Sequence, residues 1–270
     1  MAASAYHGRR KAAGRLTEIV TEPIDPAWRP DTGSMRHEFR FDPLHYGVGG
    51  DQQAAFKDRM RRELRQYGFL LTGEVAVHWR LLVDERSRWE SDRGADVDNF
   101  AKLLDDGLCG PNGIMIDDVQ VQSLEIHWQG TPDVPRFELT IDCQPEEWLT
   151  RPISLYELAD GLWHPLPDRL HDNPDHTAQV LYGLDNGVAL VKRLRHQLRL
   201  QHGLSAAAAY EATRWVGIQS RGLHTSRADA SGIPRFKRRE WMRQHGRPAD
   251  LEPLADDQLQ RMAAAIAATR

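Results

Sequence analysis

The chain has few cysteines and no long apolar run. Only two of its 270 residues are cysteines, Cys109 and Cys143, and they match neither a metal-binding spacing nor a disulfide framework. No apolar segment approaches the length of a membrane span, and the N-terminus lacks the hydrophobic stretch of a secretory signal. These absences argue against a disulfide-stapled domain and a transmembrane helix, so we expect a protein of the reducing cytoplasm.

Zinc motifs, repeats and N-terminal acids are also missing. Histidines are frequent in the C-terminal half, but none pairs with another at a zinc-binding spacing, and no segment of the chain repeats. Residues 1–15 contain no acidic residue, whereas Arg9, Arg10 and Lys11 make them basic. We therefore expect residues 1–35 to form a basic flexible tail, with a transit peptide as the alternative interpretation.

Apolar periodicity predicts a small α/β domain of the α+β kind over residues 36–145. Apolar and polar side chains alternate over residues 75–83 and 137–143, which is the pattern of half-buried strands, and residues 39–41 indicate an earlier strand. Residues 56–67 carry apolar side chains at helical spacing. A small mixed sheet with helices packed on it is the fold that satisfies this order of elements.

Acidic residues and one lysine are crowded into a short stretch of this domain. If residues 95–98 are extended, Asp96 and Asp98 point to the same side, because the side chains of a strand alternate. Apolar residues at helical spacing start at Phe100, so we expect Asp98 to cap a helix and Lys102 to follow one turn later. Carboxylates about 4 Å apart repel by roughly 4 kcal/mol near a surface, and a divalent cation would remove that cost.

A second acidic pair, Asp117 and Asp118, follows a turn at residues 109–113 and a short apolar run at residues 114–116. This run would deliver the pair to the edge of a strand. Because adjacent strand residues face opposite ways, one member would join the first acidic pair, and we favour Asp118. A β-bulge would bring in both.

In these two motifs the chain resembles the RusA-type Holliday junction resolvases, metal-dependent endonucleases of bacteria and their phages. The family pattern is Asp-x-Asp-Asn, a lysine four residues after the second Asp, an Asp four residues beyond, and a turn leading to Asp-Asp-x-Gln-Val. All nine positions are filled, by Asp96, Asp98, Asn99, Lys102, Asp106, Asp117, Asp118, Gln120 and Val121. The resemblance covers residues 36–145 and departs from the pattern at Ala95, where members commonly carry a basic residue or proline.

The resemblance implies a Mg²⁺ site, in which Mn²⁺ can substitute, built from Asp96, Asp98 and Asp118, with Asp117 as the alternative third ligand. It implies that Lys102 lies near the scissile phosphate. It also implies a homodimer that cleaves branched DNA.

Three further residues of the motif are expected to support the site. Asp106 would position Lys102, which stands one helical turn before it. The supporting residues are Asn99, Asp106 and Gln120.

Residues 146–270 lie outside the resemblance, and we expect them to form a mainly α-helical, basic region of unknown role. Ser154 and Glu157 match a capping box, so a helix is expected to begin there. Capping and apolar spacing also predict helices over residues 188–203, 205–215 and 256–269, and polar composition predicts loops at 164–177 and 220–232.

The overall net charge of −4 hides a strong segregation of charge. Residues 192–247 hold thirteen Lys and Arg against three acidic residues, a net charge of +10, which leaves −14 on the rest of the chain. Its densest part, residues 235–243, interleaves cations with aromatics, so we expect it to bind DNA, with a solvated helical face or a protein-binding surface as alternatives. The expected DNA contacts are Arg93, Lys102, Arg235, Lys237, Arg238, Arg239 and Arg243.

Together these features predict a Mg²⁺-dependent, structure-specific endonuclease that hydrolyses phosphodiester bonds in branched DNA, in the cytoplasm with the nucleoid, of bacterial or phage origin. One alternative is a non-catalytic DNA-binding or structural protein that retains a nuclease fold. The other is a transferase, because Asp-x-Asp also binds manganese with a sugar nucleotide. A transferase gives no reason for Asn99 and Lys102.

Overall fold

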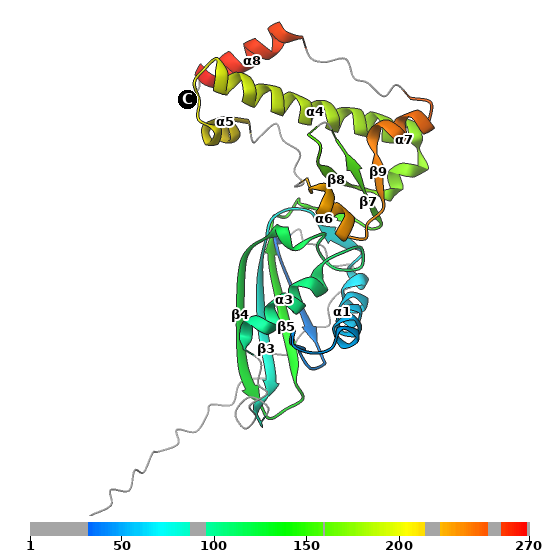
Figure 1. The fold of residues 1–270 in the computed structure, drawn as a ribbon, viewed down its shortest axis with the longest axis vertical. Coiled ribbons are helices and arrows are strands. Elements are labelled where there is room, and N and C mark those ends of the chain that lie inside the picture. Colours follow the sequence, from blue (N-terminus) through cyan, green and yellow to red (C-terminus); the bar gives the residue numbers. More distant parts are fainter. Residues whose placement is uncertain (1–31, 87–95, 159, 214–221, 248–254, 269–270) are drawn as a thin grey trace, which may run out of the picture.

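The structure is a computed structural model that describes residues 32–86, 96–158, 160–213, 222–247 and 255–268. It has two parts, a β-sheet with helices packed on it and a second region dominated by one long helix (Figure 1). The expected α+β fold is confirmed. Most of the expected N-terminal tail lies outside the described residues, but Ser34 and Met35 already belong to the first strand.

Four strands form the main sheet: β1 (Ser34–Phe39), β3 (Val75–Asp84), β4 (Val121–Thr131) and β5 (Arg136–Cys143). Their order is β1-β5-β3-β4, with β3 parallel to β4 and antiparallel to β5. Burial alternates along β3 and β5 as their sequences do, which confirms the predicted half-buried strands. Strand β4 lies at the edge of the sheet, and residues 122–125 are exposed.

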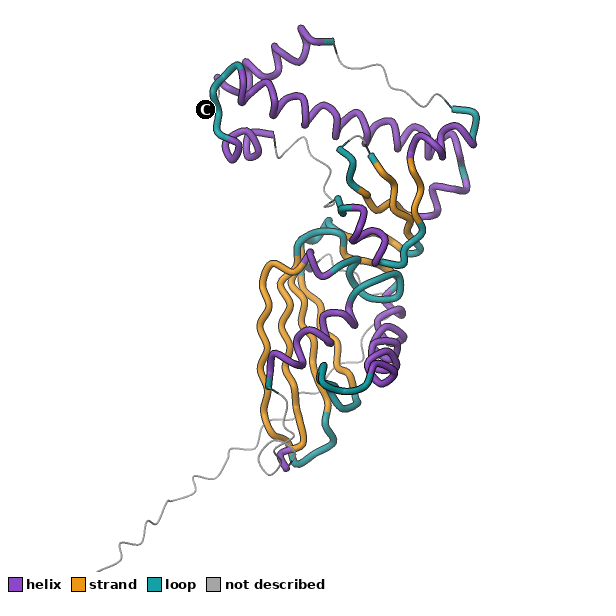
Figure 2. Tube along the Cα trace, in the orientation of Figure 1, coloured by secondary structure: helices purple, strands orange, loops and turns teal. Residues whose placement is uncertain are grey.

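Two helices, α1 (Gly50–Leu64) and α3 (Val97–Leu108), pack on this sheet and share one hydrophobic core with it (Figure 2). Helix α3 connects β3 to the parallel strand β4, so it must run in the opposite direction to both. The ring of Phe100, near the start of α3, lies 6.3 Å from that of Trp128, near the end of β4. At the other end, the Gly110 amide donates to the carbonyl of Ile116 at 3.2 Å, just before β4 begins.

Helix α3 begins earlier than its sequence suggested. Asp96, in an extended conformation, is the N-cap residue, and Asp98 already lies in the first turn. The expected extended segment therefore ends at Asp96, because Val97 buries part of its side chain as the first helical residue. Residues two apart on a helix do not face each other, so the alternation that was to align Asp96 with Asp98 is wrong.

The C-terminal region holds a three-stranded sheet that was not expected. Strand β7 (Ile153–Glu157) lies between β8 (Trp163–Pro167) and β9 (Arg235–Lys237). The predicted capping box is therefore wrong: Ser154 is a buried strand residue whose hydroxyl donates to Asp168 at 2.6 Å. Four consecutive buried residues carry no helical or strand period, so the pattern could not distinguish the two.

The helices of this region are partly as expected. Helices α5 (Ala206–Thr213) and α8 (Asp256–Ala268) confirm the prediction, and the Ser205 hydroxyl accepts from the Ala208 amide at 3.1 Å as a helix cap. The long helix α4 (Pro174–Leu200) starts well before the expected residue, inside a predicted loop, because Asn173 caps it and Pro174 suits its first turn. None of the described helices is long and apolar enough to cross a membrane.

The second predicted loop also contains regular structure. Its described part forms the short helix α6 (Thr225–Ala230), and the basic stretch that follows β9 forms α7 (Arg238–Gln244). The loop predictions were therefore wrong over both polar stretches. Polar composition indicates exposure, and short helices such as α6 are exposed over most of their surface.

A hydrophobic cluster joins the two parts of the molecule. Leu70 lies in β2 (Phe69–Leu71), which pairs with β6 (Trp148–Thr150), and together with Ile116 it packs against the C-terminal sheet and α6. The C-terminal members of this buried cluster are Ile153, Leu155, Trp163, Leu223, Ala228 and Ile233. The stretch that leads into Asp117 is thus wedged between both parts.

We predict that Gly113→Ala destabilises the protein by roughly 1–3 kcal/mol, because overpacking in a tight site costs about that much. A Cβ atom at Gly113 would lie 2.0 Å from the backbone oxygen of Leu108, which cannot swing away as a side chain could. Urea unfolding monitored by circular dichroism would measure the change. Gly183→Ala in α4 is the control: its Cβ meets nothing within 4 Å, so the variant should gain about 0.5–1 kcal/mol. Equal stability of the two variants would contradict the steric argument.

Candidate functional site

The turn that carries Asp117 and Asp118 is held rigidly. Asp117 caps a short 3₁₀ helix, Asp118–Gln120, and its carboxylate accepts from the Val119 amide at 3.0 Å. The buried Gln120 amide oxygen accepts from the amides of Ile116 and Asp117 at 2.8 and 3.1 Å. Its amide nitrogen donates to the carbonyls of Leu71 and Gly73 at 3.0 and 2.9 Å, which ties the turn to the end of β2.

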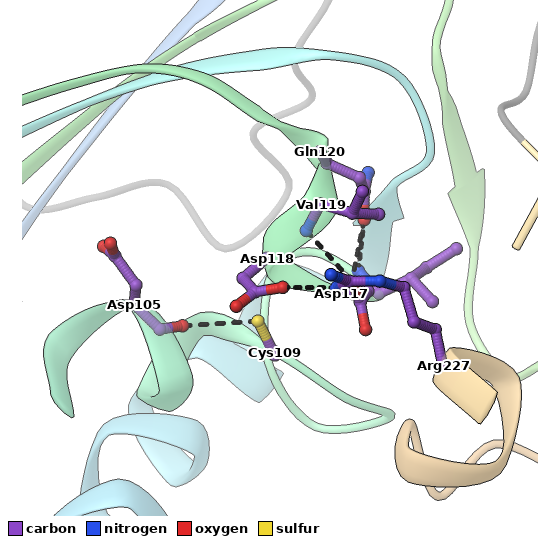
Figure 3. A network of polar contacts seen from close by, with 8 residues as sticks. Asp105, Cys109, Asp117, Asp118, Val119, Gln120 and Arg227 are labelled. Atoms are coloured by element: carbon purple, nitrogen blue, oxygen red, sulfur yellow. Dashed lines mark hydrogen bonds and ion pairs between the residues drawn. The ribbon is translucent and has the colours of Figure 1, made fainter. Parts of the chain in front are cut away.

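Both carboxylates of this turn point to one cation from the C-terminal region (Figure 3). The Nη1 atom of Arg227, in α6, lies 2.5 Å from Asp117 Oδ1 and 2.7 Å from Asp118 Oδ1. Hydrogen bonds to Asp118 and then Asp117 raise the pKa of the Arg227 guanidinium. Both carboxylates reach the same guanidinium because Asp117 and Asp118 stand at the start of a helical turn and not on adjacent positions of a strand, as the sequence had suggested.

Asp105, near the end of α3, is a third acidic residue close to the turn that carries Asp117 and Asp118. Burial raises the pKa of its carboxyl to about 6; the negative charges of Asp106 and Asp118 add to the shift, whereas a hydrogen bond from Trp79 Nε1, at 2.9 Å, opposes it. Burial, followed by the charges of the neighbouring carboxylates, also raises the pKa of the Cys109 thiol, whose sulfur lies 3.3 Å from the Asp105 carbonyl oxygen (Figure 3). Negative charge thus accumulates around the C-terminal end of α3.

The other motif residues lie at the opposite end of α3. Asp96 and Asp98 are exposed there, and Asn99 is exposed, with its backbone oxygen accepting from the Tyr46 amide at 2.8 Å. The ammonium group of Lys102 lies 4.8 Å from the centre of the Tyr46 ring. The loop around Tyr46 therefore covers the first turns of α3 and fixes the direction of Lys102.

The expected role of Asp106 is not found. Its carboxylate lies 3.7 Å from the ammonium of Lys57 in α1, and its backbone oxygen accepts from Arg61 at 2.9 Å. No ion pair joins Asp106 to Lys102 among the described residues. Asp106 therefore fastens α3 to α1, because α1 presents the nearer cation.

The first acidic pair, Asp96 and Asp98, is not brought together with Asp117 and Asp118 within one chain. Helix α3 has twelve residues, so its ends are about 18 Å apart at 1.5 Å per residue. Asp98 stands in the first turn of α3. Asp118, in contrast, lies close enough to Asp105 and Cys109, at the last turn of α3, for its charge to affect their pKa values. Over the described residues, no three His, Cys, Asp or Glu side chains are grouped so that they could hold a metal ion.

The predicted DNA-contacting residues differ in accessibility. Arg238 is buried and pairs with the buried Asp185 at 3.2 Å, so it cannot contact DNA directly in this conformation. Arg235, Lys237, Arg239 and Arg243 are exposed around it, and Arg235 pairs with Asp229. Arg93 lies outside the described residues.

A second basic surface lines a cavity of about 750 Å³ in the C-terminal region. The guanidinium of Arg195 stacks 4.5 Å from the centre of the exposed Tyr210 ring. The charged lining residues are Asp160, Lys192, Arg193, Arg195, Arg199 and Asp256. Cations therefore outnumber acids around this cavity.

Sequence analysis missed two residues that lie beside the acidic turn, Asp105 and Arg227. Asp105 was not singled out, because nothing in the sequence shows that the indole nitrogen of Trp79 donates a hydrogen bond to it. Arg227 fell in a predicted loop, and its contact with Asp117 spans 110 residues of sequence. Neither contact has a local signal, since both depend on how distant segments pack.

We predict that Asp105→Asn changes how stability depends on pH. The pKa of Asp105 is raised in the folded chain, so this state binds the proton more tightly than the unfolded state, and stability falls as pH rises from about 4 to about 6. The asparagine variant lacks this loss and should be more stable than the parent at pH 7.5 but not at pH 4. Urea unfolding of both proteins at both pH values measures the difference. Parallel profiles for the parent and Asp105→Asn would refute the assignment.

Comparison with known proteins supports the motif. No curated protein matches the chain. Residues 48–142, which include both acidic motifs, α3 and nearly all of β3, β4 and β5, match the family model of endodeoxyribonuclease RusA. These residues therefore form a domain of the RusA endodeoxyribonuclease family.

Proposed function

We propose that the protein is a Mg²⁺-dependent, structure-specific endonuclease that hydrolyses phosphodiester bonds in branched DNA, as a Holliday junction resolvase does. The family of residues 48–142 supports nuclease chemistry in general. The observation that carries the proposal is the convergence of Asp117 and Asp118 on a single cationic nitrogen. A carboxylate pair held in this way is suited to a hard cation such as Mg²⁺ or Mn²⁺.

In this proposal Asp96, Asp98 and Asp118 hold the metal, and Asp117 is the alternative third ligand. A bound divalent ion would lower the pKa of a water and polarise the phosphate. Lys102, kept in place by Tyr46, would neutralise the charge that develops on the phosphate oxygens during attack. Gln120 contributes by fixing the backbone that presents Asp117 and Asp118.

The separation of the acids suggests how the site is completed. A single chain places Asp98 and Asp118 at opposite ends of α3, so a second copy must supply one of the groups if all three ligands are to meet. The exposed edge strand β4 is the surface that fits a second copy, because one of its two edges faces no other strand of the sheet among the described residues. Leu124, at 43% exposed, adds an apolar side chain on the same face as the partly buried Trp128.

An antiparallel pairing of two β4 strands around a two-fold axis would bring the groups together. It would place Val121 of one copy beside Thr131 of the other, because the middle residue of the strand is Ile126. The turn before Val121 carries Asp118, and the end near Thr131 lies beside the start of α3, as the contact between Trp128 and Phe100 indicates. Asp118 of one copy would then approach Asp96 and Asp98 of the other.

The C-terminal region would contribute contacts to DNA. Arg235, Lys237, Arg239 and Arg243 provide exposed charge. The cavity beside α4 adds more cations together with an exposed aromatic ring at Tyr210, a combination that suits phosphates and unpaired bases.

We predict that Asp98→Asn and Asp118→Asn each lower cleavage of a synthetic four-way junction by about two orders of magnitude or more, because each removes a charged metal ligand. DNA binding in a mobility-shift assay should persist, since a negative charge is lost. Cleavage is measured on denaturing gels with Mg²⁺, using a linear duplex as the control substrate. Full nicking by either variant would exclude its carboxylate from the site.

Mixing these two variants tests the shared site. A dimer of one Asp98→Asn chain and one Asp118→Asn chain contains one site with both changes and one site with neither. Co-expressed chains should therefore recover about a quarter of the parent nicking rate, since half of randomly paired dimers are mixed and each has one intact site. A site built within one chain would leave every site of the mixture defective, and no activity would return.

We also predict that replacing Arg235, Lys237 and Arg239 with glutamate weakens DNA binding. Each lost phosphate contact should reduce the slope of log affinity against log salt by about 0.9. Fluorescence anisotropy of a labelled junction over a salt series measures both quantities. Arg261→Glu in α8, an exposed arginine paired with Asp257, is the matched control for a change of charge elsewhere. Affinity and slope equal to those of the parent would remove this surface from the proposal.

A further inference from the structure

We propose that Arg227 competes with the divalent metal for Asp117 and Asp118, so that the C-terminal region sets the metal affinity of the nuclease site. This inference rests on the proposed metal site. Arg227 lies outside residues 48–142, so the family match assigns it no role. Its Nη1 atom contacts one oxygen of each carboxylate, which is the place that a shared cation would take.

The backbone of Arg227 is firmly placed. The next residue, Ala228, is buried in the cluster that also contains Ile116, one residue before Asp117. The Thr225 hydroxyl accepts from the indole nitrogen of Trp163 at 3.1 Å, which ties the start of α6 to β8. Helix α6 and the acidic turn are thus parts of one packed unit, and Arg227 is aimed at the turn by that packing.

The side chain, in contrast, is free to leave. Arg227 is 44% exposed and Asp118 is 57% exposed, so water and ions reach their contact, whereas Asp117 is only 12% exposed. Exposed ion pairs are weak because solvent screens them and long side chains lose rotamer freedom in them. A divalent ion that gains two or more carboxylate ligands can therefore displace the guanidinium.

Competition by Arg227 should lower the affinity of the site for the metal. Without any cation the two carboxylates repel each other, and Arg227 removes this cost in the metal-free protein. Metal binding must first break the contacts of Arg227, which weakens the apparent affinity. If Arg227 instead served only to hold the carboxylates in place for the metal, removing it would weaken binding.

The test uses the full-length protein and Mn²⁺ alone, without DNA. We expect Arg227→Ala to bind Mn²⁺ about fivefold more tightly in isothermal titration calorimetry, the factor equivalent to about 1 kcal/mol for an exposed ion pair. Its melting temperature without metal should fall, and its rise on adding Mn²⁺ should exceed that of the parent. Arg227→Lys, which keeps a cation, should lie between the two.

Arg261→Ala is the control, because it removes another solvent-exposed arginine–aspartate pair, in α8 and away from the acidic turn. It should bind Mn²⁺ as the parent does. Unchanged or weaker binding by Arg227→Ala overturns the proposal, as does an absence of Mn²⁺ binding by the parent. If Arg227→Ala binds Mn²⁺ no more tightly than the parent, a cleavage assay separates the two proposals. Cleavage by the parent that is lost in Asp98→Asn would then show that the proposed nuclease function stands although Arg227 does not compete.

Discussion

The parallel crossover from β3 through α3 to β4 is the constraint that determines where the two acidic motifs lie. Two adjacent parallel strands require their connecting helix to run backwards, so the start of α3 lies at one end of the sheet and its finish at the other. The first acidic motif stands at the start of α3 and the second just before β4. The fold therefore separates these motifs within a chain, although they are close in sequence.

The second acidic motif depends on support from three sides. Gln120 fixes its backbone through four hydrogen bonds to the main chain of this domain. Ile116 anchors it in the cluster between the two parts, and Arg227 balances its charge from the C-terminal region. A buried amide, an apolar anchor and an exposed cation thus act on one turn, and each acts through a different kind of force.

Sequence alone predicted those features that have a local physical cause. Alternation along β3, helical spacing in α3 and the cap at Ser205 follow from neighbours in the chain, and all three are found. Strand β7 was mistaken for the start of a helix, because a short buried run has no period. The motif drew attention to Asp96, Asp98, Asp117 and Asp118, whose role as metal ligands stays a prediction, whereas the burial of Asp105 and the contact of Arg227 depend on packing between distant segments.

The cluster around Leu70 and Ile116 makes the C-terminal region an integral part of the molecule. A chain that ended after the nuclease domain would lose β6, the only partner strand of β2 among the described residues, and would expose more of Leu70 and Ile116 to water. Each such side chain contributes about 1.5–3 kcal/mol when fully buried. Over the described residues, the outer helices α4, α5 and α8 contribute nothing to this cluster, whereas residues of β7 and α6 belong to it and shield part of the nuclease domain from water.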